Sequence, residues 1–179
     1  MADFPLGLAG NAPTDNGISV LDPRQPCGYI GANLQGASAV WPTANTAIYI
    51  PIEIAVFTTI TAILVQVGTQ AGNLDVGIYD ETGTRLVSLG STAVAAAGVQ
   101  NCNIADTALA PGVYFVAMNC DSATAAFIRC SITADLGRSV GCQQQAVGAI
   151  ALPATATFAA YTLTYLPCIS LVTQSGGVG

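Results

Sequence analysis

Residues 72–89 read GNLDVGIYDETGTRLVSL, and this stretch decides the fold of the chain. Leu74, Val76 and Ile78 alternate with polar or small residues, which is the period-two pattern of a strand with one buried face. The sequence DETG at 80–83 is typical of a tight turn, because Gly83 can adopt the positive φ that such a turn requires. A second strand follows at 85–89, so the stretch predicts a β-hairpin.

Further strands are expected on both sides of this hairpin. Alternating or β-branched apolar runs, separated by turn residues, occupy 47–57, 58–67, 99–104, 112–119, 125–133, 161–165 and 168–173. Pro51 cannot donate a ladder hydrogen bond, so its strand should lie at a sheet edge or contain a bulge there. No segment has the length and periodicity of a stable helix. We therefore predict an all-β fold, an antiparallel β-sandwich that is jelly-roll-like.

The first 44 residues differ from the rest, because they are rich in proline and glycine and hold no lasting periodicity. We expect three parts: an extended N-terminal arm at 1–44, a β-sandwich domain at 45–174 and a glycine-rich tail at 175–179. The arm still carries large apolar side chains that a solvated linker would lack, so it should dock on a partner or across its own sandwich. The residues expected to make this contact are Phe4, Leu6, Leu8, Ile18, Leu21, Tyr29 and Trp41.

The composition favours a protein that is packed against other molecules. Charged residues make up 8% of the chain and hydrophobic residues 52%, whereas a typical soluble domain has about 25% charged residues. The alternative is a sandwich that simply carries few surface charges. The chain has no apolar run long enough to span a membrane and no secretory signal at its start, so we expect assembly in a cytoplasm and no membrane partner.

The charges also argue against nucleic acid as a direct partner. The net charge is −6, lysine and histidine are absent, and the cations are scattered at Arg24, Arg85, Arg129 and Arg138. Binding to phosphates requires clustered cations that displace counterions.

The sequence predicts no catalytic, cofactor-binding or metal site. Without histidine and lysine, the remaining catalytic option is a carboxylate pair, as in glycoside hydrolysis, drawn from Asp75, Asp80 and Glu81. Solvated turn residues explain Asp80 and Glu81 more simply. Calcium is the one metal considered, with Asp80, Glu81 and the Asp121-Ser122 pair as candidate ligands. The aromatic residues Trp41, Tyr49, Tyr79, Tyr114, Tyr161 and Tyr165 fit packing on sheet faces better than sugar stacking.

Six cysteines lie at positions 27, 102, 120, 130, 142 and 168. Their spacing matches no metal-binding pattern, and no export signal supports a disulfide framework. We expect them to be reduced and to act as small apolar residues, with a single bridge formed after cell lysis as the alternative.

The hairpin at 72–80 and 83–87, the later string DTALAPGVYFVAM at 106–118 and the opening MADFP together resemble a module of structural proteins from tailed-bacteriophage virions. The resemblance covers about 47–133 and is to small jelly-roll-like sandwich proteins of the decoration, or cement, type. Similar strings also occur in carbohydrate-binding sandwiches.

The resemblance implies a non-enzymatic role. The leading hypothesis is a capsid decoration protein on the outer surface of the head, which binds the major capsid protein and forms a homo-oligomer, with a trimer favoured. The arm and packing between subunits would stabilise the shell. The alternative is a tail, baseplate or fibre component that binds host glycans through an exposed groove including Tyr79 or Tyr114. A polysaccharide hydrolase using Asp75 or Asp80 ranks third.

Overall fold

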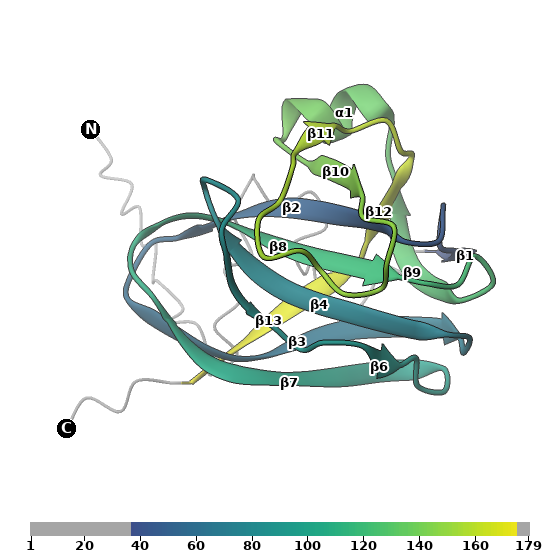
Figure 1. Cartoon of the computed structure of the whole chain (residues 1–179), viewed down its shortest axis with the longest axis horizontal. Helices are drawn as coiled ribbons and strands as arrows, with labels where there is room; N and C mark the ends of the chain where they lie inside the picture. Colours follow the sequence, from purple (N-terminus) through teal and green to yellow (C-terminus); the bar gives the residue numbers. More distant parts are fainter. Residues whose placement is uncertain (1–36, 175–179) are drawn as a thin grey trace, which may run out of the picture.

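A computed structural model describes residues 37–174 and shows two antiparallel β-sheets packed face to face (Figure 1). Four strands of the first sheet, which we call sheet I, pair in the order β1, β9, β3, β7. Four strands of the second, sheet II, pair in the order β2, β8, β4, β5. The bounds are β1 Ala37–Val40, β2 Thr46–Ile54, β3 Thr58–Thr69, β4 Asn73–Asp80, β5 Arg85–Ser88, β7 Gly98–Leu109, β8 Gly112–Cys120 and β9 Ala126–Ser131.

The order of these eight strands is that of a jelly roll, as the sequence predicted. Along the chain, every connection between them crosses from one sheet to the other, except the β4–β5 hairpin within sheet II. The first strand therefore lies beside the last of the eight, which closes the sandwich.

The remaining elements extend both sheets. In sheet II, β6 pairs with β4, β10 with β2, and β11 with β10; in sheet I, β12 pairs with β9 and β13 with β3. The short helix α1 was not predicted from the sequence; Thr133 caps it by accepting a hydrogen bond from the Leu136 amide at 3.1 Å. None of the helices within 37–174 has the length and apolar character needed to cross a membrane. The bounds are β6 Thr92–Ala93, α1 Ala134–Ser139, β10 Gln143–Ala146, β11 Ala159–Ala160, β12 Tyr165–Pro167 and β13 Ile169–Gln174.

The hairpin that β4 and β5 form confirms the prediction for 72–89. Leu74, Val76 and Ile78 are fully buried between the sheets, and Gly83 has a φ of 87°. The expectation of a single buried face was wrong, because Asp75 and Tyr79 on the opposite face are fully buried as well.

Pro51 lies in β2 at the place where one neighbouring strand ends. The ladder between β2 and β10 stops at Tyr49, whereas β2 continues to pair with β8 through Pro51 and Phe115 without a register shift. The missing N–H of Pro51 therefore breaks no ladder, which confirms the edge position and not the bulge.

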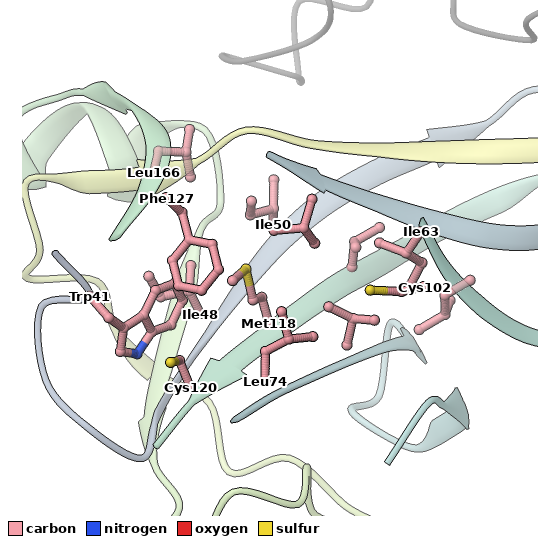
Figure 2. Packing of buried hydrophobic residues seen from close by; sticks show 14 of the residues in the cluster. Trp41, Ile48, Ile50, Ile63, Leu74, Cys102, Met118, Cys120, Phe127 and Leu166 are labelled. Carbon is pink, nitrogen blue, oxygen red and sulfur yellow. The ribbon is translucent and has the colours of Figure 1, made fainter. Parts of the chain in front are cut away.

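Trp41 closes one end of the core between the sheets. Its ring packs edge-on against Phe127 and Tyr165, with ring centroids 5.7 and 5.5 Å apart, and its amide donates to the Ala125 carbonyl at 2.8 Å. Figure 2 shows Trp41, Phe127 and Cys120 at this end of the core, with Ile63 and Cys102 at the other.

The predicted boundary between the arm and the sandwich at residue 44 is too late in the chain, as β1 and Trp41 show. The strand Ala37–Val40 pairs with β9 and completes sheet I, and Trp41 is 0% exposed, so neither belongs to an arm. A side chain enclosed in this way cannot contact a partner. The other contact residues expected in the arm, Phe4, Leu6, Leu8, Ile18, Leu21 and Tyr29, lie outside the described residues.

A second apolar cluster lies on the outer face of sheet II. The connection 147–158 between β10 and β11 crosses this face, as Figure 1 shows, and inserts Leu152 and Ala156 against Tyr49 and Tyr79. The rings of Tyr49 and Tyr79 pack edge-on at 5.2 Å. A Cβ at Gly77 would lie 2.5 Å from the Val87 carbonyl oxygen and 3.2 Å from Leu152, so this position requires glycine. The central part of sheet II is therefore buried on both faces.

The cysteines follow the prediction only in part. Cys102, Cys120 and Cys142 are free and buried, and Cys168 is free and half-buried. Burial raises the pKa of the Cys102 and Cys120 thiols to about 11, so they stay protonated and behave as small apolar side chains. Cys130 is disulfide-bonded, which corrects the expectation that all six are reduced.

Candidate interaction surface

The turn between β2 and β3 exposes large apolar side chains at one end of the sandwich. Val56 is 68% exposed and Phe57 is 70% exposed. The Thr58 hydroxyl donates to the Val56 carbonyl at 2.8 Å and holds the turn. Turns that face water usually consist of glycine, proline, asparagine, aspartate and serine, so two large apolar residues here indicate a contact surface.

The turn between β7 and β8 lies beside this apolar turn. Ile54 pairs with Gly112 and Thr58 pairs with Leu109, so Ala110 and Pro111 are its direct neighbours and are also exposed. The Tyr114 hydroxyl donates to the Ala110 carbonyl at 3.0 Å and fixes the second turn. We call Val56, Phe57, Ala110 and Pro111 the apolar tip; it forms the bend at the left of Figure 1, where β2 continues into β3 and β7 into β8.

The sequence did not single out this tip, although a signal was present. The run from 54 to 57 reads IAVF, and its hydrophobicity fits the continuation of a strand. The β2–β8 ladder ends at Ile54 and the β3–β7 ladder begins at Thr58. Because this break depends on strand pairing between distant parts of the chain, the hydrophobic pattern of the sequence could not distinguish the turn from a strand.

Asp75, the first candidate for a catalytic carboxylate, is enclosed and bonded on both oxygens. Its Oδ1 accepts from the Gly90 amide and its Oδ2 from the Leu152 amide, each at 2.9 Å. Burial raises the pKa of this carboxyl, and the two amide hydrogen bonds oppose that rise. The side chain thus connects β4 to the segment that covers sheet II.

Asn119 supports the same segment from the neighbouring strand. It lies opposite Asp75 in the β4–β8 ladder and is fully buried. Its Nδ2 donates to the carbonyls of Ala149 and Ile150, both at 2.8 Å. Asp75 and Asn119 together bind the backbone of the covering segment at Ala149, Ile150 and Leu152, so the amide of the buried Leu152 has a partner.

Asp80, the second candidate, organises the hairpin turn. Its Oδ1 accepts from the amides of Thr82 and Thr84, each at 2.9 Å, and from the Thr82 hydroxyl at 2.7 Å. These hydrogen bonds lower the pKa of the Asp80 carboxyl. Asp75 and Asp80 are five residues apart on β4, so their side chains lie on opposite faces of the strand. The structure therefore does not bring them together as a catalytic pair.

The calcium candidates are also separated. Asp121 accepts from the amide and the side chain of Asn73, at 2.7 and 2.9 Å, at the far end of β4 from Asp80. Within 37–174, the structure brings no three carboxylate or cysteine groups together in an arrangement that could hold a metal ion.

The two tyrosines expected in a glycan-binding groove differ in their burial. Tyr79 is fully buried, and its hydroxyl donates to the Pro153 carbonyl at 2.6 Å. Tyr114 is half-buried at the base of the β7–β8 turn. The placement of Tyr79 in such a groove was therefore wrong, because 147–158 covers it.

Comparison of the chain with protein-family models, with curated proteins and with solved structures finds no match.

Proposed function

We propose that this chain is a non-enzymatic structural protein of a tailed-bacteriophage virion, a capsid decoration protein on the outer surface of the head. The observation that carries the proposal is the apolar tip, where Val56 and Phe57 are 68% and 70% exposed at the end of a closed sandwich. The resemblance of the β4–β5 and β7–β8 sequences to virion sandwich proteins supports it.

The mechanism is burial of the apolar tip against the major capsid protein after assembly in the host cytoplasm. Complete burial of a valine or phenylalanine side chain stabilises a contact by about 1.5–3 kcal/mol. A shell offers many equivalent sites, and a symmetric homo-oligomer, for which we favour a trimer, would engage several of them at once. Binding that occurs only to the intact shell shifts its stability by mass action.

The chemistry of the described residues supports a structural role. The buried carboxylate Asp75 and the turn carboxylate Asp80 are both occupied by hydrogen bonds that hold the fold together. The sandwich presents its contact residues on a short turn between two long strands, so little conformational entropy is lost when the tip docks.

The proposal is tested with full-length protein and heads that lack it, from the phage whose genome encodes the chain. Co-sedimentation measures the affinity of the wild type, of Phe57→Ser and of the matched control Leu86→Ser, since Leu86 is 43% exposed on β5. We expect Phe57→Ser to weaken binding at least roughly tenfold, which corresponds to about 1.4 kcal/mol, and Leu86→Ser to bind like the wild type.

Negative-stain images of gold-labelled protein on intact virions locate the site. Label on the head supports the proposal. Label on the tail, or equal binding by Phe57→Ser and Leu86→Ser, contradicts it. Light scattering of the purified protein gives the number of subunits and tests the trimer.

A further inference from the structure

The outer face of sheet I differs from that of sheet II. Along β3, β9 and β13, the residues Ile63, Phe127 and Leu171 pack in the core between the sheets. Because successive side chains of a strand point to opposite faces, Leu64, Ile128 and Val172 lie on the outer face.

This outer face carries an apolar patch that none of the clusters within 37–174 includes. The patch, which we call the outer patch, consists of Val40, Ala62, Leu64, Ile128 and Val172. Uncharged polar residues pair with its members on the same face, namely Ser38, Asn101, Asn103 and Ser170. Neither β3 nor β13 contains a charged residue, and the one charge on β9, Arg129, lies over the Tyr165 ring at 5.5 Å. An uncharged sheet face that carries such apolar side chains is stabilised when another part of a protein covers it, as 147–158 covers sheet II.

The chain enters the sandwich at the edge of this same sheet. Its first described strand, β1, begins at Ala37 and pairs with β9, which contributes Ile128 to the outer patch. The 36 residues that precede Ala37 can extend to roughly 120 Å, whereas five neighbouring strands span about 20–25 Å. The segment 1–36 therefore has ample length to cross the sheet.

Cys130 provides an independent observation on the same sheet. It follows Ile128 by two positions on β9, pairs with Leu166 of β12, and packs against the edge of the core cluster. It is disulfide-bonded, while Cys102, Cys120, Cys142 and Cys168 are free. Of the six cysteines in the sequence, only Cys27 is left as a partner within the chain.

We propose that residues 1–36 of the same chain cover the outer patch, and that Cys27 is the disulfide partner of Cys130. The segment contains the apolar residues Phe4, Leu6, Leu8, Ile18, Leu21 and Tyr29, which suit an uncharged sheet face. Attachment to β1 holds the segment at a high effective concentration, which favours docking on its own sheet over docking on another copy. The inference stands independently of the proposed function.

The disulfide forms by thiol–disulfide exchange with a low-molecular-weight disulfide such as oxidised glutathione. The Cys130 thiolate attacks one sulfur of that disulfide, which forms a mixed disulfide and releases one small thiolate. The Cys27 thiolate then attacks the Cys130 sulfur and releases the second. The two protein thiols are oxidised to one disulfide, and the small disulfide is reduced to two thiols.

Peptide mapping tests the pairing, because the positions of arginine separate the relevant cysteines. Trypsin cleaves after Arg24, Arg85, Arg129 and Arg138, so Cys27 lies in peptide 25–85 and Cys130 in peptide 130–138, each without another cysteine. Full-length protein is treated with oxidised glutathione, its free thiols are alkylated, and the digest is analysed without reduction. We expect 25–85 linked to 130–138, loss of this pair in Cys27→Ser, and its retention in the control Cys168→Ser.

Three outcomes of the mapping overturn the pairing: an alkylated peptide 130–138, a link from 130–138 to 86–129, or a link from 130–138 to 139–179. Mixing ¹⁴N-labelled and ¹⁵N-labelled chains before oxidation shows whether the Cys27 bonded to Cys130 belongs to the same chain or to a second copy. Linked pairs of one isotope show the same chain, whereas hybrid pairs show a second copy and overturn the proposal.

Photo-crosslinking tests the coverage of the patch without the disulfide. Leu64 is replaced by p-benzoylphenylalanine in Cys130→Ser protein, and Leu86 on sheet II serves as the control position. We expect illumination to link position 64 to a peptide within 1–36 of the same chain, and position 86 to give no such product. Links from position 64 only to 37–174, only to another copy, or to nothing contradict the proposal.

Discussion

The carboxylate of Asp75 accepts a hydrogen bond of 2.9 Å from the amide of Leu152, 77 positions further along the chain. Its second oxygen binds the Gly90 amide, so one buried side chain ties β4 to the connection after β5 and to the segment that covers sheet II. The strands that flank the covering segment, β10 and β11, are short and offer few ladder hydrogen bonds. The position of the segment on sheet II therefore depends on the hydrogen bonds of Asp75.

Asp75→Asn should destabilise the protein by about 1–3 kcal/mol. An asparagine offers one acceptor oxygen and one NH₂ group, so the NH₂ group faces a backbone N–H and leaves a buried donor without a partner. Urea unfolding monitored by circular dichroism measures the change, and Asp106→Asn on the exposed side of β7 is the control. Equal midpoints for the two variants would show that the Asp75 hydrogen bonds contribute nothing to stability.

The contribution of Asp80 to the free energy of unfolding should depend on pH. Hydrogen bonds from Thr82 and Thr84 lower its pKa in the folded state, so its stabilising effect is present above the unfolded pKa, about 3.9, and is lost as the pH falls through the folded value. The difference in unfolding free energy between the wild type and Asp80→Asn should therefore shrink as the pH is lowered through this range. Glu81→Gln controls for removal of a negative charge from the same turn; an identical pH profile for both variants would contradict this assignment.

Trp41→Ala should cost about 3–5 kcal/mol, the range for removing a large aromatic side chain from a core. The reason is the loss of contacts with Phe127 and Tyr165. The control Leu86→Ala, at a residue of β5 that is 43% exposed, should change stability by less than about 0.5 kcal/mol. A Trp41→Ala protein with wild-type stability would place Trp41 outside the core.

Gly137→Ala should destabilise the protein by about 1–3 kcal/mol, although alanine favours helix formation by about 1 kcal/mol. A Cβ at this position of α1 would lie 2.3 Å from Cδ1 of the Tyr161 ring, which is itself fully buried. Leu136→Ala, at an exposed residue of the same helix, is the control. Thermal unfolding that gives a higher melting temperature for Gly137→Ala than for the wild type would show that the ring moves away freely.

The sequence was sufficient to predict the sandwich because its central strands carry their own signal. Leu74, Val76 and Ile78 alternate, and Gly83 marks the turn that follows them. The strand β1 carries no such signal, since ASAV is short and of weak strand preference, and it forms only because β9 offers a ladder.

The candidate surface was harder to predict, because exposure is a tertiary property. Trp41 and Phe57 are both aromatic residues near proline- or threonine-containing turns, yet one is enclosed and the other is 70% exposed. The covering segment 147–158 explains the errors at Tyr79 and Asp75, because its sequence of small residues gives no sign that it packs on a sheet.

The position of β13 beside β3 has a consequence for how this protein is made. Ser170 pairs with Leu64, and the Thr61 hydroxyl donates to the Val172 carbonyl 111 positions away. Contacts between such distant residues slow folding, because a long loop must close before any of them forms. On the ribosome, sheet I stays incomplete until β13 has emerged, so chaperones have the interval between the emergence of β3 and that of β13 in which to bind the nascent chain.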